Sequence, residues 1–376
     1  MIVLVLLVTL VGCGGKDNDV ASNKIEVSKI DLAKALIDEG KIEEAYTLLY
    51  EMGDDEEAIK LREDFLIVHK EYKLIYPDAV ETHRITYDKS GNALKKVDSD
   101  GNIIYERTYD ENNNPLTNKT YHEGGLFEIY EYEYDGNGRV YRAYYTDIEK
   151  HKHLTFKRTY NTDGNIVIQT GEEYRTDFTY DSSGRLIKEV TQNEGNVTTV
   201  ENVYDSNGNI IKSVYSMDDI YSCTTQYSYD ESGNLTYKAS VDSDDEKIEY
   251  EYAYNKNNLL LMEKCKSKDY YSEELFTYDA KGREIKYVIM DKKGVVYTAV
   301  SSYDDKNNTA LFSYMPENEE NSYEKVWYDK NGNVIKRELT YEDGAEGSYT
   351  EEYSGYMYFY RPDLKDKEEL LYDECC

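Results

Sequence analysis

Hydrophobic and polar positions alternate with a period of two along most of the chain. Between residues 225 and 229, Thr225, Tyr227 and Tyr229 alternate with Gln226 and Ser228. This alternation places the aromatic groups on one face of a β-strand and the polar groups on the other. Paired segments of this kind, separated by turn residues, continue from about residue 80 to residue 356. We therefore expect tandem antiparallel β-hairpins over 80–356.

The hairpins form a repeat in which each unit opens with Tyr-Asp or Tyr-Asn, and the units follow one another at intervals of 20 to 26 residues. The fourth residue after each opening tyrosine is always Gly or Asn, the two residues that adopt positive φ most readily. Each unit should therefore contain a tight turn, with the Asp side chain bonded to the turn amides. Two strands in each of the eleven units give about 22 strands. The opening tyrosines are Tyr87, Tyr109, Tyr134, Tyr160, Tyr180, Tyr204, Tyr229, Tyr254, Tyr278, Tyr303 and Tyr328, and the turn positions are Gly91, Asn113, Gly138, Gly164, Gly184, Gly208, Gly233, Asn258, Gly282, Asn307 and Gly332.

The Tyr-Asp opening, the Gly or Asn and the Asn or Arg that follows resemble the YD repeats of the Rhs family. The resemblance implies a continuous curved β-ribbon, which the largest members close into a shell around a toxin segment. This chain is shorter than we expect a shell to require. We therefore predict a mostly β protein in which tandem YD-repeat hairpins form an elongated curved sheet or a solenoid-like ribbon.

The last unit departs from the repeat. Tyr353 is followed by Ser354, and Met357 stands where the turn Gly or Asn is expected. We interpret residues 357–376 as a C-terminal cap and tail that protects the last strand edge. The alternative is that the aromatic run from Tyr356 to Tyr360 is a binding strip.

Residues 24–75 have a different period. Apolar residues lie at helical spacing, and Gly40 and Gly53 follow the first two runs, where a left-handed helix cap would place them. The segment ALIDEGKIEEAYTLL resembles a tetratricopeptide-type (TPR-like) helical pair. We predict a short helical N-terminal module that acts as a cap or stalk, with a peptide-binding groove as the alternative.

The N-terminus is apolar up to residue 11 and is followed by Gly12 and Cys13. This sequence resembles the lipobox of bacterial lipoproteins. The resemblance implies a signal peptide over 1–12 and a lipidated Cys13. The residues that follow are small and polar, which indicates a flexible tether, so that the lipidated Cys13 and the tether span 13–23. It also implies an extracytoplasmic protein that a lipid anchors to the bacterial cell membrane, at the cell surface.

Composition narrows the range of partners. The formal net charge of −32 repels phosphate backbones and anionic lipids, so we expect no nucleic-acid partner. The chain contains 42 tyrosines and five cysteines. Cys223 and Cys265 are not at equivalent repeat positions, and Cys375 and Cys376 are adjacent, so we interpret these four as incidental.

No motif indicates catalysis or a cofactor. His151 and His153 would lie on one face of a strand, which leaves open a two-histidine metal site, although a solvated insertion explains them as well. The run DSDGN from Asp98 lacks the remaining ligands of an EF-hand loop, because position 109 is tyrosine. We therefore expect no enzyme, no cofactor and no dedicated metal site.

Tyrosine offers both an apolar ring and a hydroxyl group, which suits contacts with sugars and with proteins. We therefore expect a monomeric, non-catalytic surface protein that binds envelope or host polysaccharide through a repeated Tyr/Asn/Asp-rich face. The alternatives are a structural spacer or protein-interaction scaffold, and an accessory or immunity partner of an Rhs-type toxin. We expect the opening tyrosines themselves to be structural, because each is tied to a turn.

Overall fold

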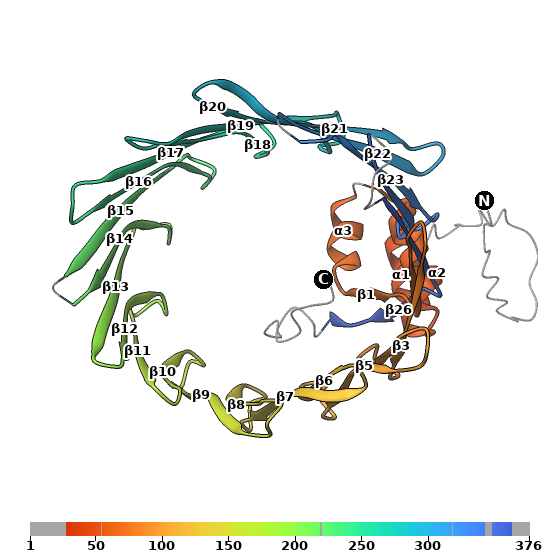
Figure 1. Ribbon diagram of the computed structural model, residues 1–376, viewed down its shortest axis with the longest axis horizontal. Coiled ribbons are helices and arrows are strands. Elements are labelled where there is room, and N and C mark those ends of the chain that lie inside the picture. Colours follow the sequence, from red (N-terminus) through yellow and green to blue (C-terminus); the bar gives the residue numbers. More distant parts are fainter. Residues whose placement is uncertain (1–27, 54, 219, 318, 343–347, 363–376) are drawn as a thin grey trace, which may run out of the picture.

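The computed structural model describes residues 28–362 except 54, 219, 318 and 343–347 (Figure 1). The predicted signal peptide, Cys13 and the tether lie outside the described residues, as do residues 363–376 of the predicted tail. Three helices precede 26 strands in the described part of the chain. The helices are α1 (Lys29–Asp38), α2 (Ile42–Glu51) and α3 (Glu56–Arg62). The strands are β1 (Phe65–Val68), β2 (Glu71–Ile75), β3 (Val80–Tyr87), β4 (Ala93–Val97), β5 (Ile103–Tyr109), β6 (Pro115–His122), β7 (Gly125–Tyr134), β8 (Val140–Thr146), β9 (Lys152–Tyr160), β10 (Ile166–Thr170), β11 (Tyr174–Tyr180), β12 (Leu186–Asn193), β13 (Asn196–Tyr204), β14 (Ile210–Met217), β15 (Tyr221–Tyr229), β16 (Leu235–Asp242), β17 (Lys247–Tyr254), β18 (Leu260–Lys266), β19 (Tyr271–Tyr278), β20 (Glu284–Asp291), β21 (Gly294–Asp304), β22 (Thr309–Pro316), β23 (Ser322–Tyr328), β24 (Val334–Tyr341), β25 (Tyr349–Ser354) and β26 (Met357–Tyr360).

Strands β2 to β25 form one closed antiparallel barrel (Figure 1). Each strand pairs with the next along the chain, and β2 pairs with both β3 and β25. The expectation of an open elongated sheet or solenoid-like ribbon is therefore wrong, although the mostly β composition is correct. The repeat pattern specifies each hairpin, but closure depends on the curvature that accumulates over all units and on a strand that is not part of the repeat.

We call the region where the two ends of the barrel meet the seam; it consists of β1, β2, β25 and β26. Four residue pairs join β1 to β26, from Phe65↔Tyr360 to Val68↔Met357, and five join β2 to β25. The backbone N–H of Lys70 also donates to the carbonyl of Ser354 at 3.1 Å. The edge of β25 is thus covered by β2, whereas β26 pairs with β1. The segment predicted as a C-terminal cap contributes to the seam instead of covering the last edge by itself.

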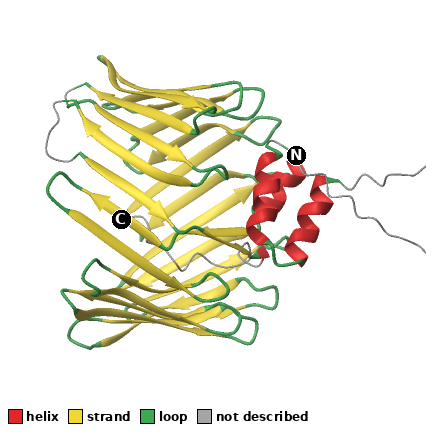
Figure 2. Ribbon diagram, turned by 90° about the vertical axis from the view of Figure 1, so that its right-hand side faces the viewer, coloured by secondary structure: helices red, strands yellow, loops and turns green. Residues whose placement is uncertain are grey.

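The three helices lie together at one end of the barrel, against the seam (Figure 2). Their core contains Ala33, Ala45 and Leu49, each fully buried, together with Phe65 of β1. Gly40 and Gly53 have φ of 75° and 62°, the left-handed conformation predicted at these positions. No helix in the described part of the chain is both long enough and apolar enough to cross a membrane.

Helical structure ends earlier than the sequence indicated. Residues 65–75 were included in the predicted helical module, but they form β1 and β2 and belong to the seam. A short apolar run such as FLIV cannot be distinguished from a helix segment by periodicity alone. For this reason β2, the strand that closes the barrel, was included in the predicted helical module.

The barrel wall is one sheet thick, and its two faces differ. In β9, Phe156, Arg158 and Tyr160 are half-buried, whereas Thr155 and Lys157 on the opposite face are more exposed. Residues that are paired across neighbouring strands lie on the same face of the sheet, so the face of Phe156, Arg158 and Tyr160 can be followed from strand to strand around the barrel. We call it the tyrosine face. Side chains converge on the concave side of a closed sheet and diverge on its convex side, so we assign the less exposed tyrosine face to the inside. Barrels of 16 or more strands are too wide for side chains to fill, so this inner face is solvated.

Candidate functional site

Each YD turn is stabilised by its own aspartate. In the first unit the backbone N–H groups of Ser90 and Asn92 donate to Asp88 Oδ1 at 2.8 and 3.0 Å, and Asn92 Nδ2 donates to Asp88 Oδ2 at 2.8 Å. The pattern recurs along the rim, and hydrogen bonds from Asn234 hold the pKa of Asp230 below its usual value. These carboxylates act as caps for their turns, as expected, and their oxygens are already used by the turn.

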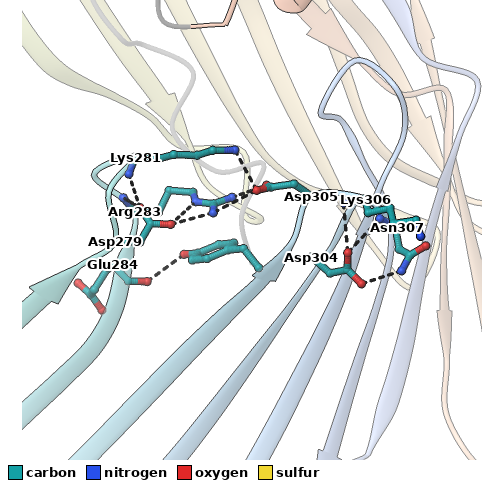
Figure 3. Close-up of polar contacts among 9 residues, drawn as sticks. Asp279, Lys281, Arg283, Glu284, Asp304, Asp305, Lys306 and Asn307 are labelled. Atoms are coloured by element: carbon teal, nitrogen blue, oxygen red, sulfur yellow. Dashed lines mark hydrogen bonds and ion pairs between the residues drawn. The ribbon is translucent and has the colours of Figure 1, made fainter.

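In some units an arginine stands where the first unit has Asn92, directly after the turn glycine. This arginine also contacts the next unit (Figure 3). Arg283 Nε donates to Asp279 Oδ2 at 2.8 Å, and Arg283 Nη1 donates to Asp305 Oδ1 at 2.6 Å. The guanidinium carbon lies 4.1 Å from the ring centroid of Tyr303, a cation–π contact. The Tyr303 hydroxyl donates to the carbonyl of Glu284 at 3.1 Å. One side chain thus connects two adjacent turns.

Ten of the eleven turn positions have positive φ: Gly91, Asn113, Gly138, Gly164, Gly184, Gly208, Gly233, Asn258, Gly282 and Gly332. Asn307 does not, and in its unit Asn308 has a φ of 51° instead. There the strands pair in regular register up to Asp304↔Thr309, whereas other units have a register shift at the opening tyrosine. The turn of this unit therefore has a different register, which moves the left-handed residue by one position.

Eight of the eleven opening tyrosines donate their hydroxyl to a backbone carbonyl earlier in the chain. The hydroxyl of Tyr204, for example, donates to the carbonyl of Leu186 at 2.8 Å. Tyr356 makes the equivalent bond to the carbonyl of Val334, so it fills this position in the final unit in place of Tyr353. Through these hydrogen bonds the tyrosines connect neighbouring units. The same bond is made by Tyr87, Tyr109, Tyr134, Tyr160, Tyr180, Tyr229 and Tyr303.

A second group of tyrosines lies in mid-strand on the same face, and we call it the mid-wall tyrosines. The rings of Tyr130 and Tyr145 are 5.2 Å apart, those of Tyr287 and Tyr297 are 5.9 Å apart, and Tyr287 also stacks on Phe276 at 5.0 Å. Their rings are partly exposed. The mid-wall tyrosines are the candidate binding surface, and they are Tyr130, Tyr145, Tyr215, Tyr250, Tyr252, Tyr287, Tyr297 and Tyr314.

One of the mid-wall tyrosines, Tyr252, should titrate late. Burial, followed by the nearby Glu263 carboxylate, raises the pKa of Tyr252 from 10.0 to about 12. A group whose pKa is raised on folding adds stability that is complete below its unfolded pKa of 10 and is lost as pH rises through 12. We predict that tyrosinate absorbance will show a late phase near pH 12 that coincides with loss of stability. Tyr252→Phe should reduce this late phase, whereas an unchanged titration curve would contradict the prediction.

The remaining candidate residues do not form a site. His151 and His153 both lie near Asp147 Oδ2, at 3.4 and 3.6 Å, but no group of three or more residues suited to a metal ion occurs in the described ranges. The run from Asp98 is a turn whose aspartate accepts from its own backbone amides. Cys223 and Cys265 are half-buried free thiols, and Cys375 and Cys376 lie outside the described residues.

The sequence set the opening tyrosines apart as structural, but it did not identify which of the other tyrosines form the mid-wall group, and it did not indicate the seam. The pairing Tyr72↔Tyr353 joins residues far apart in the sequence, and neither lies in a unit that matches the repeat. The signal that could have indicated β2 is the period-two run EYKLI just before the first unit.

No protein-family profile matches the chain, and no curated protein matches it. Among solved structures, "Crystal Structure of TcdB2-TccC3-Cdc42" aligns at 14% identity over 72% of this chain and 18% of that chain, with a TM-score of 0.34. A porin-like protein from Bacteroides uniformis aligns at 11% identity over 76% of this chain and 97% of that chain, with a TM-score of 0.23. The chain thus spans less than a fifth of the length of the toxin-complex chain. At these scores neither similarity informs the function.

Proposed function

We propose that the protein is a non-catalytic envelope protein that binds polysaccharide on the inner tyrosine face of its barrel. The observation that carries this proposal is the register, which brings the mid-wall tyrosines to one face of a closed sheet. Each ring can stack on a sugar face, and the hydroxyl oxygens can accept hydrogen bonds from sugar hydroxyls. Many weak, similar contacts along one polymer would add up through multivalency.

Closure supports an extended ligand. Closure joins the mid-wall tyrosines of separate strands into one continuous inner surface, which a polymer that enters the ring can follow along the wall. The net charge of −32 opposes anionic polymers, so the proposed ligand is neutral. A lipid on Cys13 would hold the ring at the membrane surface, and this anchor is part of the proposal.

Closure also favours a second candidate, in which the ring encloses a polypeptide and acts as the accessory partner of a toxin. The groove between α2 and β26, lined by Thr47, Leu48, Tyr356 and Tyr358, would suit a scaffold role. The helices pack on the seam, however, so they are not a separable partner-binding module. The two candidates differ in the ligand that remains bound on purification, a polypeptide for the second and a glycan for the first.

The test is co-sedimentation of purified residues 24–376 with isolated cell-wall polysaccharide, using single variants on each face. Tyr250→Ala and Tyr287→Ala remove mid-wall rings, and each should weaken binding by about tenfold, the loss expected for one stacking contact. The matched control is Tyr237→Ala, whose ring lies on the opposite face and whose hydroxyl donates to Glu249 at 2.6 Å.

Saturable binding that falls in the two mid-wall variants and persists in the control would support the proposal. Equal loss in Tyr237→Ala would place binding elsewhere. Absence of saturable binding by the unmodified protein would refute the polysaccharide proposal for the cell wall.

A further inference from the structure

A chain of polar side chains crosses the tyrosine face beside the seam. Tyr314 on β22 donates its hydroxyl to Glu324 Oε2 on β23 at 2.9 Å, and Tyr353 on β25 donates to Glu351 Oε2 at 2.7 Å. Arg337 on β24 lies between the two carboxylates, directly opposite Glu351 in the register. Five side chains from four adjacent strands therefore converge on one stretch of the inner wall.

The guanidinium of Arg337 is held loosely. Its nitrogens lie 3.8 Å from Glu324 Oε1 and 4.0 Å from Glu351 Oε2, which is too far for hydrogen bonds. No hydrogen bond joins this guanidinium to any other residue in the described part of the chain. A guanidinium carries five N–H donors in a fixed fork, so these donors face water or a ligand.

Another arginine on the same face behaves differently. Arg158 Nε donates to Gln169 Oε1 at 2.8 Å, and its guanidinium lies over the Phe156 ring at 4.1 Å. Among the residues that the structure describes, Arg337 has no partner for either kind of contact, and 46% of its side chain is exposed. The difference indicates that Arg337 is oriented by its two carboxylates while its donors remain available.

The charges of the group select the ligand. Two carboxylates surround one guanidinium, so the local charge is negative and an anionic sugar would be repelled. A neutral diol can accept from the guanidinium and donate to the carboxylate oxygens, whose orientation the tyrosine hydroxyls fix. The rings of Tyr353 and Tyr72, 6.2 Å apart, lie next to this group and offer an apolar surface for a sugar face.

We propose that Glu324, Arg337 and Glu351 form the principal subsite for a neutral sugar unit on the inner wall. The inference rests on the proposed polysaccharide-binding function and names the residues that select the sugar. The mid-wall tyrosines then extend the contact along the polymer, and the subsite distinguishes neutral from acidic glycans.

The test is calorimetric titration of purified residues 24–376 with maltohexaose, cellohexaose and chitohexaose as neutral probes and hexagalacturonate as the anionic probe. Arg337→Met removes the donors and Arg337→Lys keeps the charge without the fork. Each should weaken binding of the neutral probe by about tenfold or more, because charged hydrogen bonds are lost. Arg175→Met is the matched control, because Arg175 lies on the opposite face of the wall and donates to Asp177 at 2.6 Å, and it should change the affinity by less than about twofold.

A second readout separates ligand selection from a structural role. In the Glu324→Gln/Glu351→Gln variant two negative charges are removed, so affinity for hexagalacturonate relative to the neutral probe should rise at least about tenfold. A purely structural network would not change this ratio. Melting temperatures measured alongside verify that each variant folds.

The outcomes separate the two proposals. If a neutral probe binds the unmodified protein and both Arg337 variants bind it equally well, the subsite is wrong and the general function stands. Tighter binding of hexagalacturonate than of any neutral probe would likewise overturn the subsite. If neither the neutral probes nor cell-wall polysaccharide binds, both proposals fall.

Discussion

Deletion of residues 24–75 is expected to open the barrel. The deleted segment contains β1 and β2, and β2 supplies the pairing between β3 and β25. Without it, five residue pairs on each side of β2 are lost, together with the helical core against β26. The loss of stability should be on the order of 5 kcal/mol or more, because a buried cluster and two strand interfaces disappear together.

Amide hydrogen exchange measures this opening directly. The amides of β3 and β25 should lose protection in the deletion variant, and the two new edges should promote association between molecules. A chain lacking only residues 29–62 is the control, because it keeps β1 and β2 and should keep protection at both strands. Unchanged protection of β25 after the larger deletion would show that β2 does not close the ring.

The second large effect is expected at Gly332, in the turn of the last complete unit. Its φ is +81°, and a Cβ at this position would overlap the Tyr50 ring of α2. Gly208 occupies the same repeat position with a φ of +92°, and a Cβ added there would meet nothing within 4 Å. Gly208→Ala should therefore cost only backbone strain, about 1–2 kcal/mol. Gly332→Ala should cost on the order of 3 kcal/mol or more, because overlap adds to strain.

Denaturant titration of both variants and of the Tyr50→Ala background tests this difference. Removal of the Tyr50 ring should bring the cost of Gly332→Ala close to that of Gly208→Ala, a non-additive result expected for residues in contact. Equal costs at the two glycines in the unmodified background would mean that the helices do not rest on this turn.

The local structure of the repeat was predictable because each turn is determined by residues close in sequence. A Gly or Asn at positive φ and an Asp that accepts two amides are short-range features, and they place the turns of nearly every unit correctly. Asn307 is the exception, since a different turn register moves the left-handed conformation to Asn308. A single sequence does not show this shift, because both positions are asparagine.

Closure was not predictable in the same way. The barrel closes only if the curvature summed over all units brings β25 next to β2. This sum depends on the whole repeat region, so no short stretch of sequence specifies it. The candidate surface was predicted only as a tyrosine-rich face. All three of Tyr204, Tyr250 and Tyr287 lie on the tyrosine face, but Tyr204 ends its strand and donates to a backbone carbonyl, whereas Tyr250 and Tyr287 lie in mid-strand.

The measurement that tests the closed ring most directly is a cross-link across the seam. Lys73 and Glu352 are paired between β2 and β25, so Lys73→Cys and Glu352→Cys should place two thiols within disulfide range. With the native cysteines replaced by serine in residues 24–376, mild oxidation should give an intramolecular disulfide, whereas the Lys73→Cys/Glu338→Cys control should not. Failure of the first pair to cross-link, or equal cross-linking of the control, would contradict a barrel closed between β2 and β25.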